Sequence, residues 1–248
     1  MRKKNAKVRI ALAVVGTAAV LAAVSVAAGF LVYNGYFHVN GAAAGKYPVR
    51  GVDVSHYQGE IDWQVLAGQD IMFAYIKATE GSTFTDEKFA VNYAEAGKTK
   101  LRVGAYHFFS FDSPGGAQAQ HFIETVEICQ GMLPPVVDVE FYGNKREDPP
   151  EADEVERELQ DYLVAVQQAY GMTPVIYATK EIWERYLRGR FDDYLLWIRD
   201  IWREPELEGW TFWQYTNRGR LGGFSGDEKY VDLNVFYGTL EQWREFCY

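Results

Sequence analysis

The sequence predicts an α/β fold preceded by a membrane-spanning helix. Two observations favour the α/β class: short apolar runs alternate with longer segments of helical periodicity, and acidic residues gather where several of those runs end. Strands separated by helices pair in parallel, either in a barrel or in a doubly wound sheet. The third observation is an uncharged apolar stretch near the N-terminus. Together they predict one outer domain on a membrane anchor.

Residues 10–32 form an apolar run of 23 residues without a charge. As a helix this run is long enough to cross a hydrocarbon core of about 30 Å. The basic residues near it all lie in residues 1–9, so the positive-inside rule keeps that segment in the cytoplasm. A cleaved signal peptide usually has a shorter apolar stretch, of about 7–15 residues. We therefore expect an uncleaved single-pass anchor in the cell membrane, with cleavage and secretion as the alternative.

An acidic extracellular domain is expected to follow the anchor. Residues 33–49, with runs of glycine and alanine, are expected to form a short stalk, and residues 50–248 the domain itself. Residues 1–45 hold five basic and no acidic residues, whereas the rest of the chain holds 20 basic and 34 acidic residues. Nucleic-acid binding depends on Lys and Arg that neutralise phosphates. We therefore expect no nucleic-acid partner.

The cysteines and histidines show no metal-ligand spacing. Cys129 and Cys247 are far apart, no CxxC occurs, and the histidines are scattered at positions 38, 56, 107 and 121. Zinc sites place these residue types in close pairs. We expect neither a metal nor a cofactor. Whether the two cysteines form a disulfide stays open, because spacing alone does not decide it.

The elements of the outer domain follow from periodicity. The expected strands are residues 51–55, 71–78, 102–109, 135–140, 174–177, 194–198, 211–215 and 230–235. Helical periodicity marks residues 86–96, 117–129, 149–170 and 180–187. No Gly-x-Gly-x-x-Gly motif or P-loop follows the first strand, which disfavours nucleotide-binding sheets. The domain is close to the lower limit of about 200 residues for a (β/α) barrel, so some outer helices should be short or missing.

The longest predicted helix has clear boundaries. Asp148 is the expected N-cap, Pro149 and Pro150 suit the first turn, and Gly171 stops the helix. Acidic residues in its first turn favour the positive end of the helix dipole. The acidic run there therefore predicts a solvated helix start, not a binding site.

Four acidic residues lie where strands are expected to end. Asp138 and Glu140, in Val-Val-Asp-Val-Glu, point to one side of their strand because side chains alternate. Asp53 on the first strand and Asp232 on the last are also set among apolar residues. In a closed barrel the first and last strands are neighbours, so these two could lie side by side. The active site of a barrel lies at the carboxyl ends of its strands, which predicts one acidic cup.

An acidic cup suits divalent-metal chemistry or glycoside hydrolysis. Aromatic residues in or beside the strand ends favour the second, because aromatic rings are platforms for sugars: Tyr75, Tyr106, Tyr177, Trp197, Trp213 and Tyr215. Core packing is the alternative interpretation of these rings. A pair of close carboxyl groups raises the pKa of one of them, which makes an acid and a base from the same residue type.

Six short motifs, in order, resemble glycoside hydrolase family 25, the Chalaropsis-type lysozymes. They are Gly51-Val-Asp-Val-Ser-His-Tyr-Gln-Gly59 with Ile61-Asp-Trp63, Ile76-Lys-Ala-Thr-Glu-Gly81, Gly104-Ala-Tyr-His-Phe108, Val137-Asp-Val-Glu140, Trp213-Gln-Tyr215 and Val231-Asp-Leu-Asn234. The likeness runs from about Val49 to the C-terminus. The resemblance implies an irregular (β/α) barrel of the TIM type. It also implies hydrolysis of the β-1,4 bond between N-acetylmuramic acid and N-acetylglucosamine, so that the partner is the glycan of peptidoglycan.

The resemblance also assigns roles to residues. Carried over by motif, Glu140 is the general acid and Asp138 its partner, with Asp53 and Asp232 as further pocket acids. In the matching motifs Lys77, Glu80, Tyr106 and Gln214 are expected to line the groove. The aromatic residues Tyr177 and Trp213, chosen for their place at strand ends, are also expected to contact substrate. Asp138 attacks the anomeric carbon or orients the 2-acetamido group of the substrate as nucleophile, and we favour the second. Both routes retain the anomeric configuration.

Two other interpretations compete with a muramidase. The first is a catalytically silent barrel that binds glycan as the scaffold of a membrane-tethered wall-remodelling machine. Intact Asp138 and Glu140 speak against it. The second, a metal-dependent polysaccharide deacetylase, needs histidine ligands beside an Asp, and His56 and His107 are too few. Protein partners, and whether the wall attacked is the cell's own, do not follow from the sequence.

Overall fold

Eight strands of the described residues close a barrel. The structure, a computed structural model, describes residues 2–129, 131–226 and 228–246. The strands are β1 (Arg50–Val54), β2 (Phe73–Glu80), β4 (Arg102–Phe108), β5 (Val136–Val139), β6 (Val175–Thr179), β7 (Leu195–Arg199), β8 (Trp210–Gly219) and β9 (Val231–Phe236). They pair in the order β1-β9-β8-β7-β6-β5-β4-β2, and β2 pairs with β1 to close the circle. A short strand β3 (Phe84–Thr85) extends the end of β2. The predicted barrel is confirmed.

One strand runs against the others, which corrects the expectation of parallel pairing throughout. β9 is antiparallel to both β1 and β8, whereas β1, β2, β4, β5, β6, β7 and β8 are parallel to their other neighbours in the barrel. Parallel neighbours need a crossover, usually a helix. No helix occurs among the described residues between β8 and β9, so the chain turns back directly and β9 enters the barrel from the opposite end.

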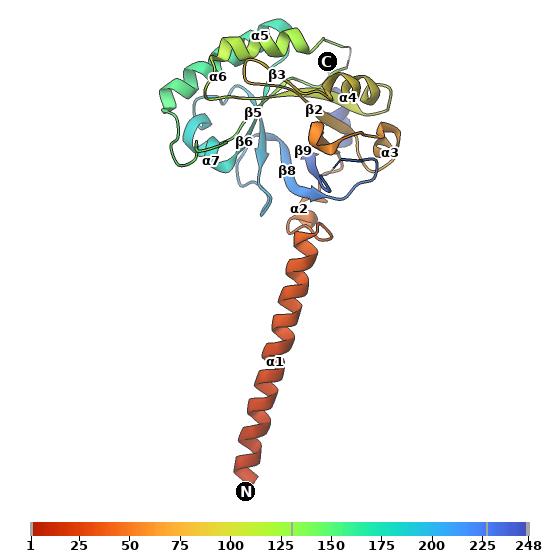
Figure 1. Ribbon diagram of the computed structural model, residues 1–248, viewed down its shortest axis with the longest axis vertical. Helices are drawn as coiled ribbons and strands as arrows, with labels where there is room; N and C mark the ends of the chain where they lie inside the picture. The colour runs from red at the N-terminus through yellow and green to blue at the C-terminus, as the bar shows by residue number, and fades with distance from the viewer. Residues whose placement is uncertain (1, 130, 227, 247–248) are drawn as a thin grey trace.

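The helices are unevenly distributed around the barrel. They are α3 (Trp63–Ala67), α4 (Phe89–Ala96), α5 (Gly115–Thr125), α6 (Ala152–Tyr170), α7 (Lys180–Ile182) with the π-helical turn Trp183–Leu187, and α8 (Leu240–Glu245). In Figure 1 α4, α5 and α6 lie on the side opposite to the N-terminal helix. The described residues between β7 and β8 contain no helix. The prediction of short or missing outer helices is confirmed.

The start of α6 differs from the prediction. The helix begins at Ala152 with Glu151 as N-cap, and the cap makes no side-chain hydrogen bond. Asp148 is therefore not the cap. A proline disfavours the α conformation of the residue before it, so Pro150 prevents Pro149 from opening the helix. The other end agrees with the sequence: Gly171 has a φ of 66°, a left-handed conformation that favours glycine.

The barrel interior is filled by aromatic side chains below the strand ends. Phe73, Tyr75, Trp197 and Phe212 belong to one buried cluster. A Cβ atom at Gly104 would lie 2.3 Å from the ring of Tyr75, so the sequence leaves side-chain space for that ring. A second cluster joins the outer faces of the strands to the helices. The buried aromatic cluster inside the barrel forms the floor of a pocket at the strand ends.

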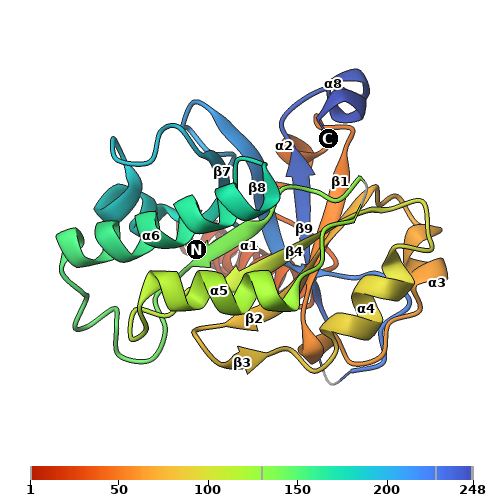
Figure 2. The same cartoon turned by 90° about the horizontal axis from the view of Figure 1, so that it is seen from above.

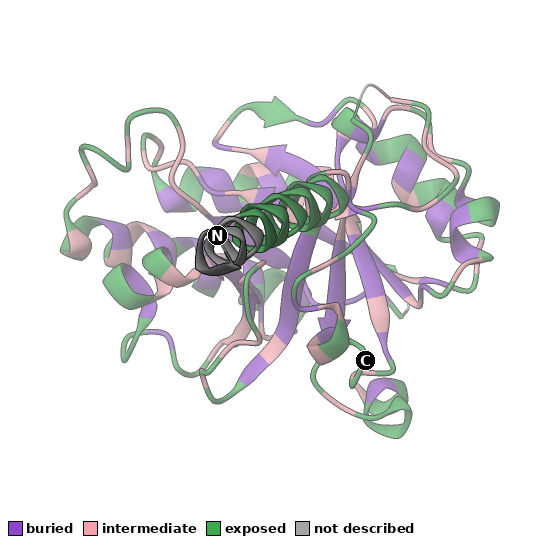
Figure 3. Cartoon of the chain, turned by 90° about the horizontal axis from the view of Figure 1, so that it is seen from below, coloured by how far each residue is buried: buried purple, intermediate pink, exposed green. Residues whose placement is uncertain are grey.

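The N-terminal helix α1 (Arg2–Tyr33) projects away from the barrel (Figure 1). Its stretch Leu12–Tyr33 has a mean hydropathy of 2.2, long and apolar enough to cross a membrane, and is not buried. Figure 3, seen from below, shows these exposed turns in front of the barrel. A short helix α2 (Gly41–Ala44) follows. Of residues 33–49, expected to form a stalk, Tyr33 is the last residue of α1, and residues 34–49 lie against the barrel, with Ala44 and Val49 buried.

Candidate active site

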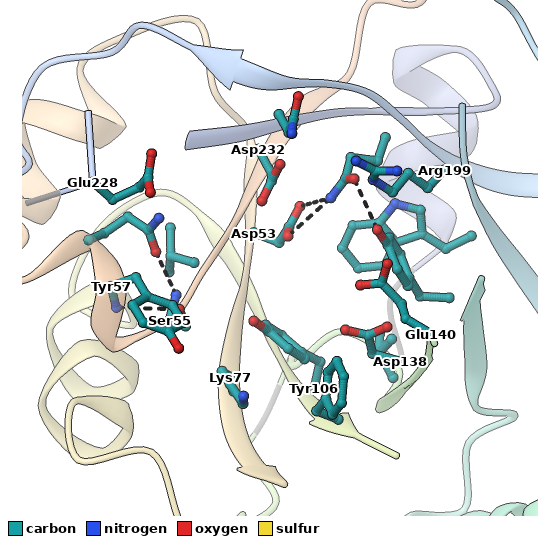
Figure 4. Close-up of a pocket in the computed structure, with 18 of the residues that line it drawn as sticks. Asp53, Ser55, Tyr57, Lys77, Tyr106, Asp138, Glu140, Arg199, Glu228 and Asp232 are labelled. Carbon is teal, nitrogen blue, oxygen red and sulfur yellow. Dashed lines mark hydrogen bonds between the residues drawn. The ribbon is translucent and has the colours of Figure 1, made fainter. Parts of the chain in front are cut away.

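A pocket of about 380 Å³ opens at the carboxyl ends of the parallel strands (Figure 4). Eight of the ten residues predicted for the site line it: Asp53, Lys77, Tyr106, Asp138, Glu140, Tyr177, Gln214 and Asp232. They come from β1, β2, β4, β5, β6, β8 and β9, and Glu140 follows β5 directly. The acidic cup expected from the sequence is present.

Asp138 and Glu140 lie side by side in the pocket, as Figure 4 shows. Val139 between them is fully buried in the outer cluster, as strand alternation requires. Burial raises the pKa of Glu140, and the charge of Asp53 raises it further. Burial raises the pKa of Asp138 well above its ordinary value, and the charge of Glu140 adds to this effect. Both groups are therefore able to hold a proton at a higher pH than a solvated carboxyl group.

Asp138 also has an unused acceptor. Its Oδ1 atom is buried and has no hydrogen-bond partner among the described residues. A buried carboxyl oxygen without a partner is costly unless a ligand supplies a donor. The side chain faces the cavity between Tyr106 and Glu140 (Figure 4). Asp138 is thus placed to accept a hydrogen bond from a molecule bound in the pocket.

Asp53, in contrast, is held by amide donors from the last strands. Asn234 Nδ2 donates to Asp53 Oδ2 at 2.6 Å, and Gln214 Nε2 donates to both carboxyl oxygens at 3.1 and 3.3 Å. The Tyr177 hydroxyl donates to Gln214 Oε1 at 3.0 Å, and Trp197 Nε1 donates to Asn234 Oδ1 at 3.0 Å. These bonds fix which end of each amide faces Asp53. The network holds the carboxyl group in one orientation.

Burial raises the pKa of Asp53 to about 6, although the hydrogen bonds from Asn234 and Gln214 lower it in part. Asp232 lies opposite Asp53 in the antiparallel pair of β1 and β9. Burial raises the pKa of Asp232 well above its ordinary value, and the charge of Asp53 raises it further. The reversed strand β9 therefore brings a fourth acid to the pocket from its first residues.

Two cations face these acids. Lys77 is buried, and its Nζ donates to Glu80 Oε2 at 2.6 Å. Arg199, at the end of β7, lies beside Glu140 in Figure 4. Its charge lowers the pKa of Asp53, Glu140 and Asp232 and so opposes the effect of burial. With Glu228, five acids and two cations line one cavity, so proton occupancy at the site depends on the balance between burial and these charges.

The sequence profile described as "Glycosyl hydrolases family 25" matches residues 52–224. The matched range includes Asp53, Asp138 and Glu140 and covers most of the barrel. The chain belongs to glycoside hydrolase family 25.

Known proteins of this family are similar in sequence and in structure. A family 25 glycosyl hydrolase from Bacillus anthracis is 48% identical, with a TM-score of 0.77, over 81% of this chain and 94% of that one. A bacterial lysozyme from Streptomyces coelicolor is 31% identical, with a TM-score of 0.70, over 80% of this chain and 96% of that one. Lysozyme M1 of Streptomyces globisporus is 33% identical over 77% of this chain and 68% of its own length. As a member of family 25, this protein is a glycoside hydrolase.

Two predicted substrate contacts do not line the family 25 pocket. Trp213 is fully buried on the outer side of β8, where its Nε1 donates to the carbonyl oxygen of Asp200 at 2.8 Å. The prediction for Trp213 is corrected, since Gln214 is its neighbour on the strand and faces the pocket. Glu80 lies behind Lys77 as its ion-pair partner.

Several pocket residues of this family 25 barrel were not predicted. They are Ser55, Tyr57, Gln58, Phe108, Arg199, Asn217, Glu228 and Tyr230. A signal existed for Arg199, which stands two residues after the pocket residue Trp197 and therefore on the same side of β7. Glu228 and Tyr230 come from the irregular segment before β9, where no periodicity indicates direction. Cys247, one half of the possible disulfide, lies outside the described residues.

Proposed function

We propose that this protein is a membrane-anchored muramidase of the cell wall. It hydrolyses the β-1,4 bond between N-acetylmuramic acid and N-acetylglucosamine in peptidoglycan. The observation that carries the proposal is the pairing of Asp138 and Glu140 in one pocket, with burial raising the pKa of both groups. Family 25 membership and similarity to proteins named lysozyme and N,O-diacetylmuramidase support the substrate class.

Glu140 is the general acid of this proposal. A glycosidase must protonate the leaving oxygen, and a carboxyl group with a raised pKa still carries its proton near neutral pH. Burial raises the pKa of Glu140, while Arg199 stabilises the carboxylate that remains after proton transfer. The same carboxylate then takes a proton from the attacking water in the second half of the reaction.

Asp138 orients the 2-acetamido group of the muramic acid residue, whose carbonyl oxygen attacks the anomeric carbon. The free Oδ1 atom of Asp138 supports this role, because it is a buried acceptor for the acetamido N–H. Attack by the substrate's own group, followed by water, gives two inversions and so retains the configuration. Direct attack by Asp138 also gives retention, and a substrate without the acetamido group distinguishes the two routes.

The remaining pocket residues bind the substrate or adjust the pKa values of the catalytic pair. Asp53, fixed by Gln214 and Asn234, and Asp232 opposite it adjust the proton occupancy of the catalytic pair. Lys77 and Tyr106 face the same cavity and contact the sugar, whereas Tyr177 orients Gln214. Glu80 acts through Lys77, whose ammonium group it holds.

The α1 helix anchors the enzyme in the cell membrane in this proposal. The apolar stretch Leu12–Tyr33 and the basic residues before it support a single span with a cytoplasmic N-terminus and an extracellular barrel. A domain that hydrolyses peptidoglycan has its substrate on that side.

Mass spectrometry of fragments released from purified peptidoglycan tests the proposed reaction. Fragments with muramic acid at the reducing end are expected from the wild type. In Glu140→Gln release should fall by about 10²–10⁴-fold with folding intact, while Glu154→Gln on the exposed face of α6 keeps wild-type activity. Reducing-end glucosamine would contradict the bond assignment. Binding of glycan without any release by the wild type would favour the silent scaffold.

A further inference from the structure

The end of α1 is shaped to meet the barrel. Gly35 has a φ of 65°, its N–H donates to Val32 O at 3.0 Å, and the N–H of Tyr36 donates to Leu31 O at 2.9 Å. These two bonds form a Schellman motif, which ends a helix in a fixed direction. A Cβ atom at Gly35 would lie 2.2 Å from the carbonyl oxygen of Arg218. The chain leaving α1 therefore passes in direct contact with the end of β8.

Two arginines of the barrel hold this turn. Arg218 Nη1 donates to Tyr33 O at 2.6 Å, and its guanidinium lies over the Tyr33 ring at 4.6 Å. Arg220 Nη1 donates to Asn34 O at 3.0 Å and lies over the Tyr36 ring at 4.4 Å. Each arginine thus binds one of the last carbonyl groups at the negative end of the α1 dipole and stacks on an aromatic ring.

The next residues pack along the outer face of β8. His38 contacts Tyr215 with ring centroids 6.1 Å apart, and Tyr47 contacts Trp210 and Trp213 at 5.2 and 6.4 Å. No helix of the described residues between β7 and β8 covers this face, so residues 38–47 cover it instead. Trp213, buried here, owes part of its burial to the segment that follows the anchor.

The same segment is bonded to the loop after β7. Asn40 Nδ2 donates to Asp200 O at 3.1 Å, and Glu204 accepts from Lys46 Nζ at 2.8 Å and from the Tyr47 hydroxyl at 2.6 Å. Backbone bonding continues to the start of β1, where the N–H of Phe236 donates to the carbonyl oxygen of Val49 at 3.0 Å. Polar and apolar contacts therefore join residues 34–49 to the barrel over their whole length.

Large apolar side chains are exposed around this junction. Tyr33, Tyr36 and Phe37 are about 60% exposed, and Trp202, on the loop that Asn40 and Tyr47 hold, is 68% exposed. Aromatic side chains of this kind are favoured at the headgroup level of a bilayer. Because they continue the exposed surface of α1, the occupant they fit is the outer leaflet that surrounds the end of that helix.

We propose that residues 34–49 hold the barrel rigidly on the outer leaflet, with Tyr33, Tyr36, Phe37 and Trp202 in the headgroup layer. This inference rests on the part of the proposed function that places α1 in the membrane. In Figure 2, seen along the long axis of the molecule, β1 and β9 run across the view while α1 is seen end on. The pocket at the strand ends therefore opens sideways, along the membrane.

Paired spin labels test the rigid connection. In the full-length chain with Cys129→Ser and Cys247→Ser, nitroxides at Leu12→Cys on α1 and Gln167→Cys on α6 are measured in nanodiscs of phosphatidylethanolamine and phosphatidylglycerol. A rigid connection predicts one narrow distance distribution. Gly35→Ala should broaden it, because the added methyl meets the Arg218 carbonyl oxygen, whereas Gly41→Ala, whose Cβ finds ordinary contact at 3.5 Å, should not. A broad distribution in the unsubstituted junction overturns the inference.

A substitution at Gly35 tests the junction more specifically than one at Arg218, which also contacts a pocket residue. The guanidinium of Arg218 also lies over the ring of Tyr230 at 5.3 Å, and Tyr230 lines the pocket. Gly35 touches no pocket residue, so Gly35→Ala should hydrolyse soluble glycan fragments at the wild-type rate. If the wild type does not hydrolyse glycan at all, the proposed function is contradicted. If the wild type hydrolyses glycan but its junction is flexible, only the rigid placement of the barrel on the outer leaflet is contradicted.

Collision accessibility tests the membrane contact by itself. A single nitroxide at Trp202→Cys, in the same cysteine-free chain and vesicles of the same lipids, should be more accessible to oxygen and less accessible to a water-soluble nickel chelate than one at Gln167→Cys. Equal accessibility at the two positions would show that the barrel stands clear of the leaflet and would overturn the proposed surface.

Discussion

Asp53 and Asp232 lie opposite each other across the antiparallel pair of β1 and β9, which joins the two ends of the barrel sequence. In such a pair the side chains of opposed residues point to the same face, with Cβ atoms about 5 Å apart. Two carboxyl groups in a buried pocket at this separation are not both ionised without cost. The pair therefore makes the stability of the fold depend on pH.

Replacement of Asp53 should change that pH dependence. Burial raises the pKa of Asp53 from 3.8 to about 6 in the folded protein. Between these values the folded state binds more protons than the unfolded state, so this group's contribution to stability is present below pH 4 and is lost as the pH rises through 6. Relative to wild type, the unfolding free energy of Asp53→Asn should therefore rise by about 1–3 kcal/mol from pH 4 to pH 7. Asp161→Asn, on the exposed face of α6, should follow the wild-type curve. Parallel curves for Asp53→Asn, measured by urea unfolding, would show that the carboxyl group is not buried as described.

Loss of Arg199 should move the activity profile to higher pH. Burial raises the pKa of Glu140, and the charge of Arg199 is the main influence that opposes it. Without that charge the acid keeps its proton to a higher pH, so the basic limb of kcat/KM in Arg199→Gln shifts upward. Arg199 also lowers the pKa of Asp53 and Asp232, so the acidic limb should move in the same direction. Arg203→Gln, at an exposed position outside the pocket, serves as the control. An unchanged or lowered optimum in Arg199→Gln would contradict the electrostatic role.

Two aromatic substitutions should distinguish a residue of the core from a residue of the pocket. Trp213→Phe removes the bond from Nε1 to Asp200 O and part of a buried ring, so we expect about 1–3 kcal/mol lower stability with unchanged kcat and KM. Tyr106→Phe removes a hydroxyl from the pocket, and we expect kcat/KM to fall about tenfold or more while stability changes little. Thermal unfolding and steady-state rates on one glycan substrate measure both. If Trp213→Phe instead lowered kcat/KM and left stability unchanged, Trp213 would belong to the binding site.

The acetamido group of the substrate should be required for cleavage. If Asp138 orients this group, glycan whose muramic acid is de-N-acetylated is hydrolysed about 10²-fold more slowly or not at all, because the nucleophile is missing. Proton NMR of the first product formed from N-acetylated glycan should show the β anomer. Comparable rates on both substrates would instead favour direct attack by Asp138, and an α product would exclude both routes.

Most of the strands of the barrel and its pocket acids could be predicted, because they depend on patterns between residues that are close in the sequence. Asp138 and Glu140 stand two apart at the end of an apolar run, and strand alternation alone aims them at one face. The same alternation excludes Trp213 once Gln214 is assigned to the pocket, since neighbours on a strand point to opposite sides. The prediction for Trp213 was wrong because it rested on an aromatic residue near a strand end and not on the face of the strand where its side chain lies.

What could not be predicted depends on contacts between distant segments. The direction of β9 follows from the direct return of the chain after β8, where the residues that the structure describes form no helix, and the segment that carries Glu228 has no periodic pattern. Residues 38–47 contain little that distinguishes a flexible linker from a packed one. Their role is visible only when Tyr47 is found against Trp210 and Trp213. Such long-range pairings are set by the whole fold and not by local composition.

The closure of the barrel by β9 has a consequence for biogenesis. Asp53 is synthesised early, but its partners Gln214 and Asn234 follow 161 and 181 residues later. A nascent chain in which β8 and β9 are unfinished therefore lacks one wall of the cavity. In the function we propose, the lytic activity of the barrel arises only after these strands have been made, so a polypeptide that ends before them is harmless to the cell that makes it.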